Sequence, residues 1–222
     1  MGQITKLTAK DGFSFDVYQA EPQGKPRGAL LVIQEIFGVN SHIRSVADGF
    51  AAEGYAVMAP ALFDRAGQNF EVGYTPEDIA KGRDMRAKIP WEAAVMDMAA
   101  TVEALRRYGK VGAVGYCWGG SLAWLAATRI EGLAASVCYY GGQIVQFKDE
   151  KPKCPVMMHF GETDKSIPMS DVEAIRKAQP GAIIHVYPAG HGFNCDQRAD
   201  HDAESARLAR ERTLRFFAEH VG

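Results

Sequence analysis

The stretch that decides the fold is residues 111–120, Val-Gly-Ala-Val-Gly-Tyr-Cys-Trp-Gly-Gly. Its first four residues predict a short buried strand, and the rest opens a helix expected from about Trp118 to Ile130. A strand, a tight glycine-rich turn and a helix in this order are typical of a nucleophile elbow, which holds the central residue of G-x-C-x-G or G-x-S-x-G above a sheet. Cys117 is that central residue. The helix N-terminus behind it favours negative charge and therefore a thiolate.

The same stretch has a second interpretation, because residues 111–128 carry no charge and approach the length of a membrane span. Four glycines interrupt it, however, and charged residues flank it closely. We therefore favour a buried strand–turn–helix.

On both sides of the elbow, apolar strands alternate with amphipathic helices. Repeated β–α units predict an α/β fold, in which helices cover both faces of a mostly parallel sheet. An antiparallel hairpin is expected before them, with its turn at Asp11-Gly12. Residues 170–173, Ser-Asp-Val-Glu, predict a capping box at the start of one helix. Strands are expected at 4–9, 13–18, 29–33, 55–58, 111–114, 135–139, 155–160 and 182–187, and helices from 41, at 91–108, 118–130, 170–178 and 203–220, all in one domain over residues 1–222.

Composition excludes several classes of protein. The chain has 222 residues, with 25 Lys and Arg against 27 Asp and Glu, so its net charge of −2 offers no basic surface for nucleic acid. Four cysteines without C-x-x-C spacing do not form a disulfide scaffold, and the first residues lack the apolar run of a signal peptide. We expect a cytoplasmic monomer with reduced thiols that acts on a small molecule and binds neither nucleic acid nor a membrane.

A thiol nucleophile needs a base, and the base needs an orienting group. Asp164 follows the strand 155–160 in Gly-Glu-Thr-Asp, and His191 follows the strand 182–187 in Ala-Gly-His-Gly-Phe. Alone, each could be an ordinary turn or loop residue. Together they have the order nucleophile, acid, histidine at strand ends, where parallel sheets place their sites. Glu162 is the alternative acid.

The loop after the strand 29–33 reads Gln-Glu-Ile-Phe-Gly. In nucleophile-elbow enzymes this loop provides one oxyanion-hole amide, so we expect the N–H groups of Ile36 and Trp118 to form the hole and Phe37 to contact substrate. Glu35 could accept the Cys117 proton, or it could be a solvated glutamate at a strand end.

These motifs resemble the dienelactone hydrolase family of α/β-hydrolases over almost the whole chain. The resemblance rests on Q-E-I-F-G, G-Y-C-W-G-G, G-x-x-D, A-G-H-G-F and E-R-T-L-R-F-F. It implies the α/β-hydrolase fold and hydrolysis of enol-lactones and esters through an acyl-thioester, without metal or organic cofactor. It also implies Cys117 as nucleophile, His191 as base, Asp164 as its orienting partner and Glu35 as a switchable acceptor of the thiol proton.

The sequence departs from the family where arginines bind the substrate carboxylate. The position four residues after His191 is Cys195, and the second arginine position falls near Ile79. Lys81, Arg83 or Arg86 could substitute, or these could be solvated helix charges. From this departure we expect weaker binding of an acidic lactone.

Other functions remain open on the same residues. The sequence also fits a broad carboxylesterase or thioesterase, and a catalytically silent relative that only binds a small molecule. The complete set of Cys117, His191 and Asp164 favours an enzyme, because a binding protein has no need of a strained nucleophile. A redox role for Cys117 lacks a resolving cysteine at motif spacing.

Overall fold

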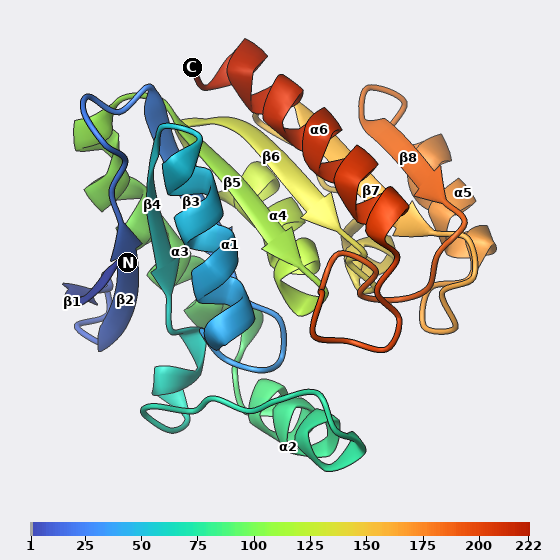
Figure 1. Ribbon diagram of the computed structural model, residues 1–222, viewed down its shortest axis with the longest axis horizontal. Helices are drawn as coiled ribbons and strands as arrows, with labels where there is room; N and C mark the ends of the chain where they lie inside the picture. The colour runs from blue at the N-terminus through green and yellow to red at the C-terminus, as the bar shows by residue number, and fades with distance from the viewer. Residues whose placement is uncertain (1) are drawn as a thin grey trace.

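A computed structural model describes residues 2–222. Figure 1 shows a twisted sheet with helices on both faces. The strands are β1 (Gln3–Thr8), β2 (Ser14–Ala20), β3 (Gly28–Ile33), β4 (Tyr55–Pro60), β5 (Val111–Tyr116), β6 (Leu133–Tyr139), β7 (Val156–Gly161) and β8 (Ile183–Tyr187). The helices are α1 (Ser41–Ala52), α2 (Pro76–Ala87), α3 (Trp91–Leu105), α4 (Trp118–Arg129), α5 (Met169–Ala178) and α6 (Ala203–His220).

The sheet has eight strands in the order β1-β2-β4-β3-β5-β6-β7-β8. The β1–β2 and β2–β4 pairs are antiparallel, and all the others are parallel. The predicted mostly parallel sheet with an N-terminal antiparallel hairpin is therefore confirmed. Every residue of β3, β4, β5 and β7 is buried, as expected for strands covered on both faces.

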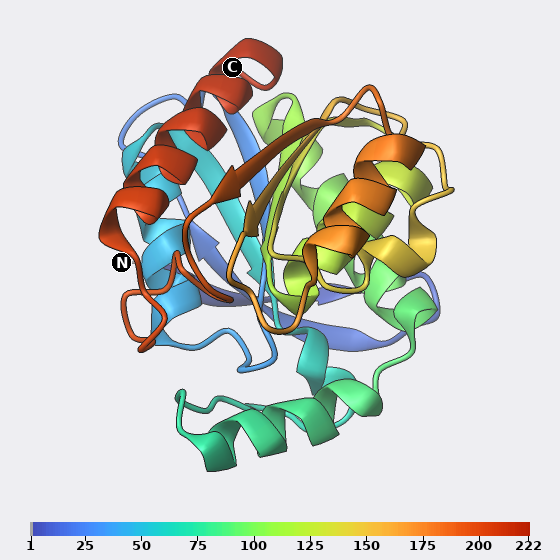
Figure 2. The same cartoon turned by 90° about the vertical axis from the view of Figure 1, so that its right-hand side faces the viewer.

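The helices form two layers. In Figure 2, α1 and α6 cover one face of the sheet, while α3, α4 and α5 cover the other. On α6, Phe216 and Phe217 are buried, and the Phe217 ring makes edge-to-face contacts with the rings of Phe50 and Tyr55. None of the helices in residues 2–222 combines the length and the apolar character needed to cross a membrane.

One local expectation was wrong, and one helix was not predicted. The capping box expected at residues 170–173 does not form, because α5 begins at Met169 after Pro168 and has no side-chain cap. No helix was expected between residues 60 and 90, but α2 lies there, beyond the carboxyl ends of the parallel strands (Figure 1). A hypothetical Cβ on Gly82 of α2 would lie 2.2 Å from the carbonyl oxygen of Ile36, so the helix sits directly on the loop after β3.

Candidate active site

The β5–α4 turn holds Cys117 in a strained conformation. Its φ of 56° and ψ of −117° lie in a region that a side chain rarely adopts, and it directly precedes the first residue of α4. The flanking glycines make this possible. A Cβ on Gly115 would lie 1.9 Å from the carbonyl oxygen of Gly119, and one on Gly119 would lie 2.4 Å from those of Ile33 and Gln34. Each glycine of G-x-C-x-G is therefore required, because a side chain at either position would collide with a backbone carbonyl oxygen.

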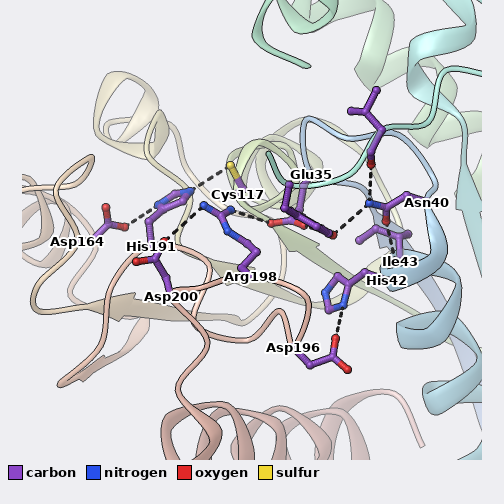
Figure 3. Close-up of polar contacts among 12 residues, drawn as sticks. Glu35, Asn40, His42, Ile43, Cys117, Asp164, His191, Asp196, Arg198 and Asp200 are labelled. Atoms are coloured by element: carbon purple, nitrogen blue, oxygen red, sulfur yellow. Dashed lines mark hydrogen bonds and ion pairs between the residues drawn. The ribbon is translucent and has the colours of Figure 1, made fainter. Parts of the chain in front are cut away.

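Cys117, His191 and Asp164 come together from three segments far apart in the chain (Figure 3). His191 Nε2 lies 3.2 Å from Cys117 Sγ, and His191 Nδ1 lies 2.7 Å from Asp164 Oδ2. Because a carboxylate only accepts, Nδ1 donates to Asp164 and Nε2 faces the sulfur. Asp164 Oδ1 also accepts from the backbone N–H of Ser166, which orients the carboxylate. Glu162, the alternative acid, is exposed.

Charge at this site favours a protonated His191. Burial alone would lower its pKa, but the Cys117 sulfur and the Asp164 carboxylate outweigh burial and raise the pKa of His191 well above its usual range. A protonated imidazole at this position can donate a proton to a bound molecule.

Glu35 lies next to the elbow because β3 and β5 are paired in register. Ile33 is opposite Gly115, so Glu35 and Cys117 each lie two residues beyond that pair. Glu35 is fully buried, which removes the interpretation as a solvated strand-end residue. Its Oε2 accepts a hydrogen bond from the Tyr74 hydroxyl at 3.2 Å, and its Oε1 lies 3.5 Å from Arg198 Nη1.

A cavity of about 1180 Å³ opens above Cys117 and His191. Of the residues expected at the substrate, Ile36, Phe37, Trp118, Arg83 and Arg86 all line it, together with Ile79. Lys81 is not among the lining residues. It is about half exposed and pairs with Glu77 at 2.7 Å along α2.

No sequence motif pointed to Arg198. It lies in the irregular segment before α6, where no periodicity marks a buried residue, yet its side chain is only 12% exposed and lines the cavity. It packs against His191's own loop, since a Cβ on Gly192 would lie 2.7 Å from the guanidinium. A cation thus reaches the cavity although position 195 is a cysteine.

Tyr74 is a second residue near the site that no sequence motif indicated. Burial and the nearby Glu35 raise the pKa of Tyr74, which keeps its hydroxyl protonated as a donor to that carboxylate.

A strained thiol elbow, a histidine and a buried aspartate at the strand ends of this sheet define a protein of the α/β-hydrolase class. The model of the dienelactone hydrolase family matches residues 15–221. The chain belongs to the dienelactone hydrolase family.

Individual relatives support the family assignment. A carboxymethylenebutenolidase of Pseudomonas putida is 33% identical over 96% of this chain and 94% of its own length. A Synechocystis protein assigned the same activity is 37% identical over 90% of this chain and 89% of its own. The crystal structure of a Klebsiella pneumoniae protein assigned as a dienelactone hydrolase superposes with a TM-score of 0.89, at 31% identity and 99% coverage of both chains. The predicted fold class and family are thereby confirmed.

Proposed function

We propose that this protein hydrolyses a carboxylic ester or lactone of the enol-lactone kind, with Cys117 as nucleophile. The single observation that carries the proposal is the continuous contact from Cys117 Sγ to His191 and on to Asp164, at 3.2 and 2.7 Å, at the wall of a substrate-sized cavity. Family membership supports the reaction class, and this geometry supports the residues.

In the first half-reaction the Cys117 thiolate attacks the carbonyl carbon, and the carbonyl oxygen becomes an oxyanion. The N–H groups of Ile36 and Trp118 are proposed to hold it; Trp118 is the first residue of α4, where an N–H has no partner within its own helix. Collapse breaks the carbon–oxygen bond of the ester and leaves an acyl-thioester. His191 gives its proton to the leaving oxygen, then takes one from the water that hydrolyses the thioester.

Glu35 is proposed to accept the thiol proton when substrate enters the site. It is buried beside the elbow, and its two oxygens already have Tyr74 and Arg198 as neighbours. While the site is empty the proton stays on Cys117, and a neutral thiol resists oxidation.

The cavity also favours a substrate with a carboxylate. Arg83, Arg86 and Arg198 line it, and Arg86 lies over the Trp91 ring at 4.6 Å, which fixes the direction of its guanidinium. Guanidinium groups bind carboxylates through paired, charge-assisted hydrogen bonds. Binding of an acidic substrate therefore does not depend on an arginine at position 195. A broad esterase or thioesterase is the alternative, favoured by the size of the cavity.

The test is hydrolysis of p-nitrophenyl acetate by wild type and Cys117→Ala. We expect the variant to lose activity to the background level with an unchanged circular dichroism spectrum, and His191→Ala to lose a comparable factor, because residues that act as a unit are not additive. Mass spectrometry of quenched wild-type enzyme should detect an acyl adduct on Cys117. Near wild-type turnover in Cys117→Ala would refute the cysteine mechanism.

A further inference from the structure

A second cluster of polar side chains lies outside the lining of the catalytic cavity. It consists of Glu35, His42 and Cys195, which come from the loop after β3, from α1 and from the segment before α6. One ligand-type atom of each residue lies within 4.8 Å of the other two, and all three side chains are buried. The proposed reaction uses only Glu35 of these three.

Two atoms of the cluster are buried without a hydrogen-bond partner. Glu35 Oε1 and His42 Nε2 make no hydrogen bond to any residue of 2–222. Arg198 is the nearest charge to Oε1, at 3.5 Å. Buried polar atoms are nearly always hydrogen-bonded in native proteins. An unpaired carboxylate oxygen and an unpaired imidazole nitrogen close to one thiol therefore point to a binding site for a cation.

The neighbours of the cluster orient these lone pairs. His42 Nδ1 lies 3.3 Å from Asp196 Oδ1, so Nδ1 carries the proton and Nε2 presents its lone pair (Figure 3). A carboxylate on the far nitrogen is the usual partner of a metal-binding histidine. Tyr74 in turn holds the other oxygen of Glu35.

The donor set determines the kind of ion. One sulfur, one imidazole nitrogen and one carboxylate oxygen suit Zn²⁺ or Co²⁺, whereas Mg²⁺ and Ca²⁺ require oxygen ligands. In tetrahedral zinc sites the bond lengths place the ligand atoms about 3.3–3.8 Å apart, so the cluster must contract by roughly 1 Å. A second cavity, of about 420 Å³, is lined by His42 and Asp196 and not by Cys117, so one ligand of the cluster faces a space separate from the catalytic cavity.

Charge is balanced in the occupied site. As the metal–sulfur bond forms, the Cys195 thiol releases its proton to solvent, so a dication meets two anions and a neutral imidazole. The ion pair between Arg198 and Glu35 must break when the metal binds. Asp200, whose Oδ2 lies 3.9 Å from Arg198 Nη2, is the alternative partner of the guanidinium.

We propose that Glu35, His42 and Cys195 bind a divalent transition-metal ion of the zinc class, as an inhibitory site rather than as a cofactor of hydrolysis. The bound ion holds Glu35 in the cluster and withdraws it from Cys117 and Arg198. This inhibition rests on the proposed function, whereas binding of the ion does not.

Binding is tested by adding Co²⁺ to the full-length protein and recording its absorption spectrum. We expect a thiolate-to-cobalt band with tetrahedral d–d bands in wild type and in Cys117→Ala, and also in Cys154→Ser, the matched control for a cysteine elsewhere. Cys195→Ser should lose the thiolate band, and His42→Gln should bind Co²⁺ roughly tenfold more weakly or worse. Melting curves verify that each variant is folded, and Cys195→Ala replaces a serine variant that does not fold.

Two spectra would overturn the site. A thiolate band that disappears in Cys117→Ala but persists in Cys195→Ser would put the metal on the catalytic thiol. The absence of the band in wild type at millimolar Co²⁺ would show that the cluster binds no such ion.

Inhibition is tested separately with Zn²⁺ in the p-nitrophenyl acetate assay. His42→Gln should need about tenfold more Zn²⁺ than wild type for half inhibition. Equal sensitivity of the two proteins would refute the inhibitory role. A wild type without esterase activity would refute the proposed function instead, while the cobalt spectrum would still report the site.

Discussion

At the scale of single residues, Arg198 would connect the proposed catalytic residues to the charge of a substrate. It lines the cavity, lies 3.5 Å from Glu35 and packs on the loop of His191. An acidic substrate that binds Arg198 competes with Glu35 for the same guanidinium. Binding of such a substrate then releases Glu35 from Arg198. The free carboxylate can accept the Cys117 proton, which would connect substrate binding to the protonation state of Cys117.

We predict that Arg198→Met raises KM for a carboxylate-bearing lactone by about tenfold to a hundredfold, the loss of one charge-assisted pair of roughly 1.5–3 kcal/mol. The variant also leaves Glu35 without its buried cation, which can lower kcat for every substrate. The decisive measurement is therefore the ratio of kcat/KM for the acidic lactone to that for a neutral ester. Lys81→Met, outside the cavity, is the control and should keep the wild-type ratio. An unchanged ratio in Arg198→Met would mean that this arginine does not bind the substrate carboxylate.

The placement of Cys117, His191 and Asp164 could be predicted because each occupies a motif at the end of a recognisable strand. Arg198 could not, because its burial depends on a loop that folds over Gly192 and on a carboxylate distant in the sequence. Tyr74 was missed for the same reason. Sequence alone predicts residues whose position follows from the strand pattern, and it misses those that long-range contacts bring in.

At the scale of elements, α2 shows how a helix can lack the usual sequence pattern. Gly82 is its only buried residue, so no apolar row marks it. Its start is instead defined by a capping box: Thr75 Oγ1 accepts from the N–H of Asp78, and Asp78 Oδ2 accepts from the N–H of Thr75, both at 3.2 Å. Thr-Pro-Glu-Asp at 75–78 was therefore the indication in the sequence, while Ser170-Asp171-Val172-Glu173, which has the same form, caps nothing.

We predict that Thr75→Ala destabilises α2 by about 1 kcal/mol. Because few contacts tie this helix to the core, the effect should be local: amide hydrogen exchange over 76–87 speeds up roughly fivefold with no change in the global melting temperature. Ser170→Ala is the matched control, and exchange over 169–178 should stay as in wild type. Equal exchange of α2 in wild type and Thr75→Ala would show that packing on the Ile36 loop, and not the cap, holds the helix.

At the scale of the whole molecule, a buried polar network attaches α6 to the sheet. His159 of β7 is fully buried, with Nδ1 2.8 Å from the Tyr187 hydroxyl and Nε2 3.1 Å from Thr213 Oγ1 on α6. Thr213 also lies 2.7 Å from the Tyr139 hydroxyl, and Arg212 donates to Tyr187. Burial lowers the pKa of His159 well below its usual range, and the nearby His185 and Arg212 lower it further.

This depressed pKa makes the stability of the fold depend on pH. Below about pH 6.5 the unfolded chain takes up a proton at His159 while the folded chain does not, so the contribution of His159 to the free energy of unfolding falls as the pH falls. We expect His159 to contribute a slope of up to about 1.4 kcal/mol per pH unit, measured by urea unfolding between about pH 7.5 and 5.5. His159→Gln should be less stable at neutral pH, because it disturbs the contacts to Tyr187 and Thr213, but it should have a flatter profile. The exposed His201→Gln is the control and should keep the wild-type slope, since its side chain stays in water in both states. A His159→Gln profile as steep as that of wild type would place the acid sensitivity elsewhere and leave this network a purely structural role.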